Sequence, residues 1–130
     1  MEKPIATRKK KSVPAAVKSL LRLIETSLDA DKAEDVVAIE LSGKSSIADY
    51  MVVASGRSAR QLVAMADHLA EKLKTKGIIA RSEGRGQGDW LLVDAGDVIV
   101  HLFRPEVRAH YAIEKMWNVD LPEPARAAAG

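Results

Sequence analysis

Hydrophobic and polar positions follow two different periods along this chain, and each period predicts one type of secondary structure. Apolar side chains recur every three or four positions in residues 17–28 and 62–73, which predicts two amphipathic helices. Short runs rich in β-branched and aliphatic residues predict five strands, at residues 36–41, 50–54, 78–82, 90–93 and 98–103.

Local signals set the ends of the predicted helices. Pro14 suits the start of the first helix, which we expect to end within residues 29–32. Ser58 and Gln61 match a capping box, and Gly77 supplies a left-handed C-cap, so the second helix is bounded on both sides. Pro105 is expected to open a last helix that continues to about residue 117.

The segment 89–103 predicts a tight hairpin, because two apolar runs flank the turn signal of residues 94–97. If Val93 pairs with Val98, the two-residue period of a strand fixes both faces. One face is entirely aliphatic and is expected to be core: Leu91, Val93, Val98, Val100 and Leu102. The other face mixes aromatic, polar and charged side chains, which is typical of a surface made for contact: Trp90, Leu92, Asp94, Ile99, His101 and Phe103.

The order of the elements is α-β-β-α-β-β-β-α, which predicts an α/β (α+β) single domain with a mixed five-stranded sheet flanked by helices. The second helix would serve as a crossover that makes strands 50–54 and 78–82 parallel. Residues 1–13 are expected to be a basic, disordered arm, 14–121 the folded domain, and 122–130 a flexible tail.

Charge is divided unevenly along the 130 residues. The net charge is +2, yet residues 1–18 hold six basic side chains against one acidic one and so carry +5, which leaves −3 for the remainder. A basic arm on a mildly acidic body points either to a partner rich in phosphate, such as RNA, or to a solvated tail. The absence of cysteine, of a secretory signal and of a membrane-spanning run predicts a cytoplasmic protein.

Four motifs suggest phosphate chemistry, and two of them fail on context. A strand follows the glycine-rich segment 84–88, and Gly43-Lys44-Ser45 lacks the preceding glycine and the following helix of a P-loop. The backbone amides of residues 55–58 could hold an anion, although the capping box already explains Ser58.

The fourth motif is a glycine and two serines followed by Asp49-Tyr50-Met51, which is similar to the metal-binding strand of nucleotidyltransferases. That chemistry needs two carboxylates one residue apart, and Met51 occupies the second position. Asp94 or Asp97 could supply only a third carboxylate. We therefore expect a nucleotidyltransferase-like topology without the catalytic pair, and no catalytic residue, metal or cofactor.

The histidines favour structural roles. His68 is expected to be solvated on the polar side of its helix. His101 could form an acid–base pair with Asp94, but the hairpin face has no Ser or Thr to activate. We therefore expect His101 to be a hydrogen-bonded member of an interaction face.

Several of these segments together resemble the ribosomal silencing factor family (RsfS, Iojap-related). They are IADYMVVASG at residues 47–56, the capped helix with Ser58, Arg60 and Gln61, and the hairpin sequence followed by Arg108, Tyr111 and EKMW at 114–117. The likeness covers about residues 19–121. It implies a small α/β domain, related in topology to nucleotidyltransferases, that represses translation without catalysis.

The resemblance also implies a partner and a site. Members of the family bind protein fourteen of the large ribosomal subunit and block joining of the small subunit when nutrients are scarce. The expected partner-binding residues are Asp89, Trp90, Leu92, Asp94, His101, Phe103, Arg108 and Tyr111. The basic arm is a candidate for an accessory contact with ribosomal RNA. We expect no membrane partner, and the free protein could form a homodimer. The alternatives are a nucleotidyltransferase-like enzyme and an RNA-binding module.

Overall fold

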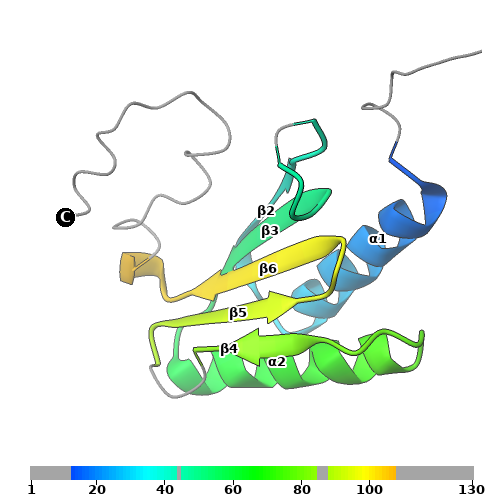
Figure 1. Ribbon diagram of the computed structural model, residues 1–130. Coiled ribbons are helices and arrows are strands. Elements are labelled where there is room, and N and C mark those ends of the chain that lie inside the picture. The colour runs from blue at the N-terminus through cyan, green and yellow to red at the C-terminus, as the bar shows by residue number, and fades with distance from the viewer. Residues whose placement is uncertain (1–12, 44, 85–87, 108–130) are drawn as a thin grey trace, which may run out of the picture.

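The computed structural model describes residues 13–43, 45–84 and 88–107 of the chain (Figure 1). Two long helices and five strands make up this part, in the order α1 (Ala15–Ala30), β2 (Glu34–Glu40), β3 (Tyr50–Ser55), α2 (Ala59–Lys74), β4 (Arg81–Glu83), β5 (Trp90–Asp94) and β6 (Val98–Phe103). The predicted last helix begins at residue 105, and residues 105–107 form its described part. Neither long helix has an apolar stretch that could span a bilayer.

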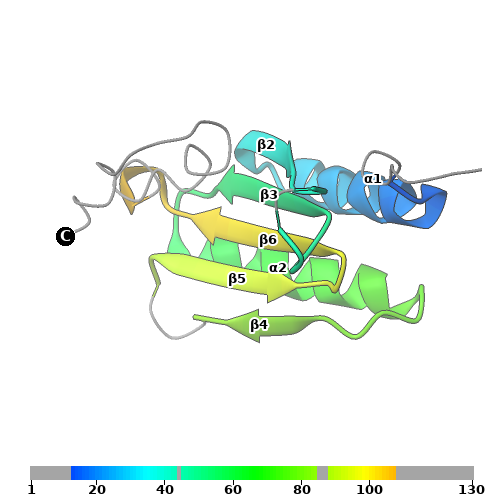
Figure 2. The ribbon, with the colours of Figure 1, turned by 45° about the horizontal axis from the view of Figure 1, so that its top comes forward.

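The five strands form one mixed sheet in the order β2-β3-β6-β5-β4. Strand β3 pairs in parallel with β6, and the other three pairings are antiparallel. Strands β3 and β4 therefore run in the same direction, as the crossover predicted, but β6 and β5 lie between them. Both α1 and α2 cover one face of the sheet (Figures 1 and 2). The predicted class, a mixed five-stranded sheet with helices, is confirmed.

The strand period divides the sheet into two hydrophobic layers. The main core lies between the helices and the sheet, where Ile24, Leu28 and Leu69 of the helices meet Val52 and Val100 of the strands. A smaller cluster occupies the opposite face and consists of Ile39, Leu41, Ala48, Met51, Val53 and Phe103. The face that we predicted as a contact surface therefore borders a second core.

The hairpin pairing differs from the prediction by two residues. Val93 lies opposite Val100 rather than Val98, and the loop consists of Gly96 and Asp97 alone. The amide of Ala95 donates to the carbonyl of Val98 at 3.0 Å, and Gly96 has a φ of +89°, which suits the first central position of a type II′ turn. A shift of two residues leaves every side chain on its predicted face, so the division of the hairpin into two faces is confirmed.

The predicted strand 78–82 is wrong at its start, because Ile78 belongs to the end of α2. Its amide donates to the carbonyl of Leu73 at 3.0 Å, and the Gly77 amide donates to that of Lys74 at 2.9 Å. These two bonds, with a φ of +79° at Gly77, form a Schellman motif. The Ile78 amide used in the cap is not available for strand pairing, and β4 begins at Arg81.

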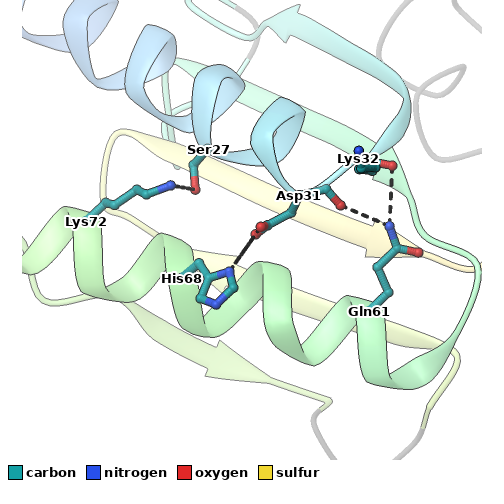
Figure 3. A network of polar contacts seen from close by, with 6 residues as sticks. All are labelled: Ser27, Asp31, Lys32, Gln61, His68 and Lys72. Atoms are coloured by element: carbon teal, nitrogen blue, oxygen red, sulfur yellow. Dashed lines mark hydrogen bonds and ion pairs between the residues drawn. The ribbon is translucent and has the colours of Figure 1, made fainter.

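Polar contacts join the end of α1 to the start of α2 (Figure 3). The Gln61 side-chain amide donates to the backbone carbonyls of Asp31 and Lys32 at 3.1 and 3.3 Å, while its carbonyl accepts from the Arg57 amide at 2.7 Å. Ser58 accepts from the Gln61 amide as predicted, but the reciprocal bond of the capping box goes to Arg57 instead of Ser58. His68 is not simply solvated, since its Nδ1 lies 2.9 Å from the Asp31 carboxylate.

Candidate partner-binding face

The hairpin brings five of the predicted site residues onto one surface, on the side of the sheet away from α1 and α2, and a sixth, Asp89, directly precedes β5. We call Asp89, Trp90, Leu92, Asp94, His101 and Phe103 the docking face. Trp90 lies directly opposite Phe103, and Leu92 lies opposite His101. The other two predicted residues, Arg108 and Tyr111, lie outside the described part of the chain.

Three rings form the centre of the docking face. Trp90 and His101 have centroids 6.3 Å apart, and the rings of His101 and Phe103 are nearly parallel at 6.0 Å. The Trp90 indole N–H donates to Nδ1 of His101 at 3.2 Å. The predicted hydrogen bond of His101 is therefore present, and its partner is Trp90. An aromatic side chain tied in this way has one preferred orientation before any partner arrives.

The hydrogen bond also fixes the state of the imidazole. An indole can only donate, so Nδ1 of His101 must accept and the ring proton must sit on Nε2. Burial lowers the pKa of His101 from 6.5 to about 4, so the ring is neutral near pH 7. The docking face thus presents a neutral aromatic centre rather than a cation.

Not every predicted residue is available for direct contact. Phe103 is only 1% exposed and belongs to the second core, so it supports the rings above it. Asp94 accepts a hydrogen bond from the Gly96 amide at 2.9 Å and thereby stabilises the turn. Trp90, Leu92 and His101 are partly exposed, and Asp89 is exposed. Asp94 is partly exposed as well, so all of the docking face except Phe103 is accessible to a partner.

The structure adds charged residues that the sequence did not single out. Arg81 and Glu83 of β4 lie opposite Asp94 and Leu92, and directly opposed side chains share a face. At the other end, Arg104 lies 3.2 Å from Asp89 and 3.4 Å from Glu106. The strand pairing identifies Arg81 and Glu83, which are outside the hairpin sequence, and the ion pairs identify Arg104, which directly follows β6.

Gly84 is a further residue that the docking face requires. A Cβ placed there would lie 2.6 Å from the Trp90 carbonyl oxygen and 3.0 Å from the indole ring, and the residue has a φ of +90°. Only glycine tolerates both conditions. Trp90 is therefore held from two sides, by His101 across the hairpin and by the chain at Gly84.

The metal motif is replaced by apolar packing. Met51 is 3% exposed and packs in the second core with Val53 and Phe103. Its neighbour Asp49 uses its backbone to extend the sheet, donating to the Asp97 carbonyl at 2.8 Å. Within residues 13–43, 45–84 and 88–107, no three potential ligands come together to hold a metal ion.

Comparisons with known proteins agree on one family. The sequence model described as "Ribosomal silencing factor during starvation" matches residues 14–128. The chain is 56% identical over 100 residues to the ribosomal silencing factor RsfS of Zymomonas mobilis, covering 76% of this chain and 75% of that protein. It is also 33% identical to a mouse protein named "Mitochondrial assembly of ribosomal large subunit protein 1", covering 75% of this chain and 44% of that one.

A solved structure gives the same result for the fold. The crystal structure of a protein from Chromobacterium violaceum superimposes with a TM-score of 0.76 at 38% sequence identity, covering 82% of this chain and 90% of the other.

Proposed function

This chain belongs to the ribosomal silencing factor (RsfS) family, and on that premise we propose that it represses translation by binding the large ribosomal subunit through protein fourteen of that subunit. The bound domain then occupies space that the small subunit needs. Nutrient limitation is the condition named in the family's description. The name of the mouse relative, which refers to assembly of the large subunit, supports the choice of subunit.

The observation that carries the proposal is the partly exposed Trp90 at the centre of the docking face, held by His101 and packed beside Phe103. Trp is among the residues most enriched at binding hot spots, because it buries a large apolar area with few rotatable bonds. A ring that is already oriented loses little further entropy when a partner covers it.

Charged residues around this centre suit a polar rim. Asp89 and Arg104 form an ion pair at one end, and Arg81 and Glu83 lie on the short edge strand at the other. Rim charges contribute mainly to specificity and association rate, while the buried centre supplies affinity. The arrangement supports a protein partner with a mixed surface of its own.

Repression by steric exclusion asks for no catalytic group. We propose that this chain is not an enzyme and that it acts in the cytoplasm, with residues 1–13 as an accessory arm. The docking face would also be covered in a homodimer of the free protein. Sedimentation equilibrium of the wild type and of a Trp90→Ala variant tests that alternative.

Co-sedimentation with purified large subunits tests the proposal. Trp90→Ala should weaken binding by about 2 kcal/mol or more, roughly thirtyfold. Ile79→Ala is the matched control, because Ile79 is 75% exposed and lies outside the docking face. Binding of purified protein fourteen should fall in parallel. Unchanged binding by a folded Trp90→Ala protein would remove Trp90 from the interface.

A further inference from the structure

A groove runs between α1 and α2 on the side of the molecule opposite the docking face. It consists of two adjoining hollows of about 300 and 400 Å³ that share Ser19, Leu23 and Lys76. Because α1 and α2 are antiparallel neighbours, the groove follows residues 16–27 of α1 along one side and has Lys72, Lys76 and Ile78, at and just beyond the end of α2, on the other. None of the predicted partner-binding residues lines it.

The polar side chains of this groove are cations and hydroxyls. Arg22, Lys72 and Lys76 carry the charge, and the hydroxyls come from Ser19, Thr26 and Ser27. Lys72 already donates to the Ser27 hydroxyl at 3.2 Å, which holds its ammonium group over the groove (Figure 3). No Asp or Glu is among the lining residues. The groove is therefore a positively charged strip.

The rest of the domain makes this strip distinctive. The described residues contain ten Lys and Arg against fourteen Asp and Glu, a net charge of −4. The groove has three cations and no carboxylate in its lining, so its local charge is positive while the net charge of the described residues is negative. A surface of net negative charge repels nucleic acid, and the groove is a local exception to that charge.

We propose that this groove binds the phosphodiester backbone of RNA. Guanidinium, ammonium and hydroxyl groups are the donors that proteins direct at phosphate oxygens. The lining includes no aromatic residue on which a base could stack, so the contact would follow the backbone without selecting a sequence.

The chain that precedes α1 supports the same occupant. The groove begins at Ala16, close to the start of α1, and residues 1–12 carry five basic side chains immediately before it. Along the sequence, basic residues therefore precede the segment that lines the groove. A long polyanion could neutralise both, whereas a short acidic peptide in the groove would leave the arm without a role.

The apolar part of the groove does not require a separate apolar ligand. Leu20 is 8% exposed and belongs to the main core, and Leu23 and Ile78 pack against that core. These side chains lie at the outer edge of the main core between the helices and the sheet. The groove and the docking face lie on opposite sides of the sheet, so one molecule could hold RNA and a protein partner together.

The test measures binding of a fluorescein-labelled 20-nucleotide oligouridylate by the full chain as a function of salt concentration. Each phosphate neutralised on a single strand contributes about 0.7 to the slope of log K against log salt. The triple variant Arg22→Gln, Lys72→Gln, Lys76→Gln should flatten this slope by about two units. Over a fourfold change in salt, its affinity should then vary roughly sixteenfold less than that of the wild type.

Two further variants make the result specific. Lys32→Gln, Arg60→Gln, Lys74→Gln removes the same number of exposed charges elsewhere and should leave the slope nearly unchanged. The double variant Lys72→Arg, Lys76→Arg keeps the charge and should retain the wild-type salt slope, which separates loss of charge from loss of folding. Trp90→Ala should bind the RNA normally, so failure at the groove and failure at the docking face can be told apart.

An equal slope in the wild type and the triple variant would overturn the proposal, as would equal losses in the triple variant and its charge-matched control. A labelled 20-residue copolymer of Glu and Leu serves as the competing probe. If that peptide binds through the three cations while RNA binding is insensitive to them, the groove is a site for an acidic protein segment instead.

Discussion

Acidification should destabilise this protein through His101. The ring is half-buried beside Trp90 and Phe103, and this burial lowers its pKa to about 4, against 6.5 for an exposed histidine. Between these two values the unfolded chain binds a proton that the folded protein does not. Stability is therefore fully present above pH 6.5 and decreases as the pH falls towards 4, which is the sign for a base whose folded pKa is depressed.

The magnitude follows from the two pKa values. Each unit of difference is worth about 1.4 kcal/mol, so the complete effect below pH 4 is roughly 3 kcal/mol. Between pH 7 and pH 5 the loss amounts to roughly 2 kcal/mol, a large fraction of the 5–15 kcal/mol that is typical for a small domain. Protonation of Nδ1 would also remove the acceptor for the Trp90 indole.

Urea unfolding at pH 7, 6 and 5 measures this contribution. His101→Gln is the matched variant, because its amide oxygen can accept from the indole but does not titrate. The free energy of unfolding should fall more steeply with acidification in the wild type than in the variant. If the two proteins lose stability equally between pH 7 and pH 5, the low pKa assigned to His101 is wrong.

Three further substitutions test the local geometry. Gly84→Ala should destabilise the fold by roughly 3 kcal/mol and displace Trp90. Gly77 also has a positive φ but a Cβ there would meet nothing within 4 Å, so Gly77→Ala should lower the stability less. Thermal melts and Trp fluorescence compare the two variants. Gln61→Ala should cost about 2 kcal/mol in denaturant unfolding, because two carbonyls and an amide lose their partner, and Gln61→Glu should restore only the bond from Arg57. Lys32→Gly should stabilise the protein by about 1 kcal/mol in the same assay, since Lys32 has a φ of +64° at the end of α1, and an unchanged midpoint would argue against strain there.

Much of the fold was predictable because its signals are local. The Ser58 cap, the Gly77 C-cap and the alternation along residues 90–103 depend on neighbours within a few positions. The faces of the hairpin survived an error of two in pairing, since the side-chain period in a strand is also two. An error of one would have inverted them.

The parts that failed depend on competition or on distance. Ile78 has strong strand propensity, yet its amide closes the cap of α2, and that bond excludes it from β4. The His68–Asp31 contact joins residues 37 positions apart. The position of β6 between β3 and β5 depends on how all five strands pair, not on any one segment. Propensity and periodicity carry no information about such pairings.

The docking face shows the same division between what a sequence can and cannot indicate. Alternation along the hairpin placed Trp90, His101 and Phe103 on the correct side of the sheet, but it gave no distinction between their roles. Pairing across the strands gives them separate roles: Phe103 is buried support, His101 is a neutral acceptor, and Trp90 is the partly exposed donor that they orient. Since the rings are fixed in the free protein, the proposed partner would bind a surface that is largely ordered before binding. A substitution at His101 should thus weaken binding through Trp90, even where His101 itself touches nothing.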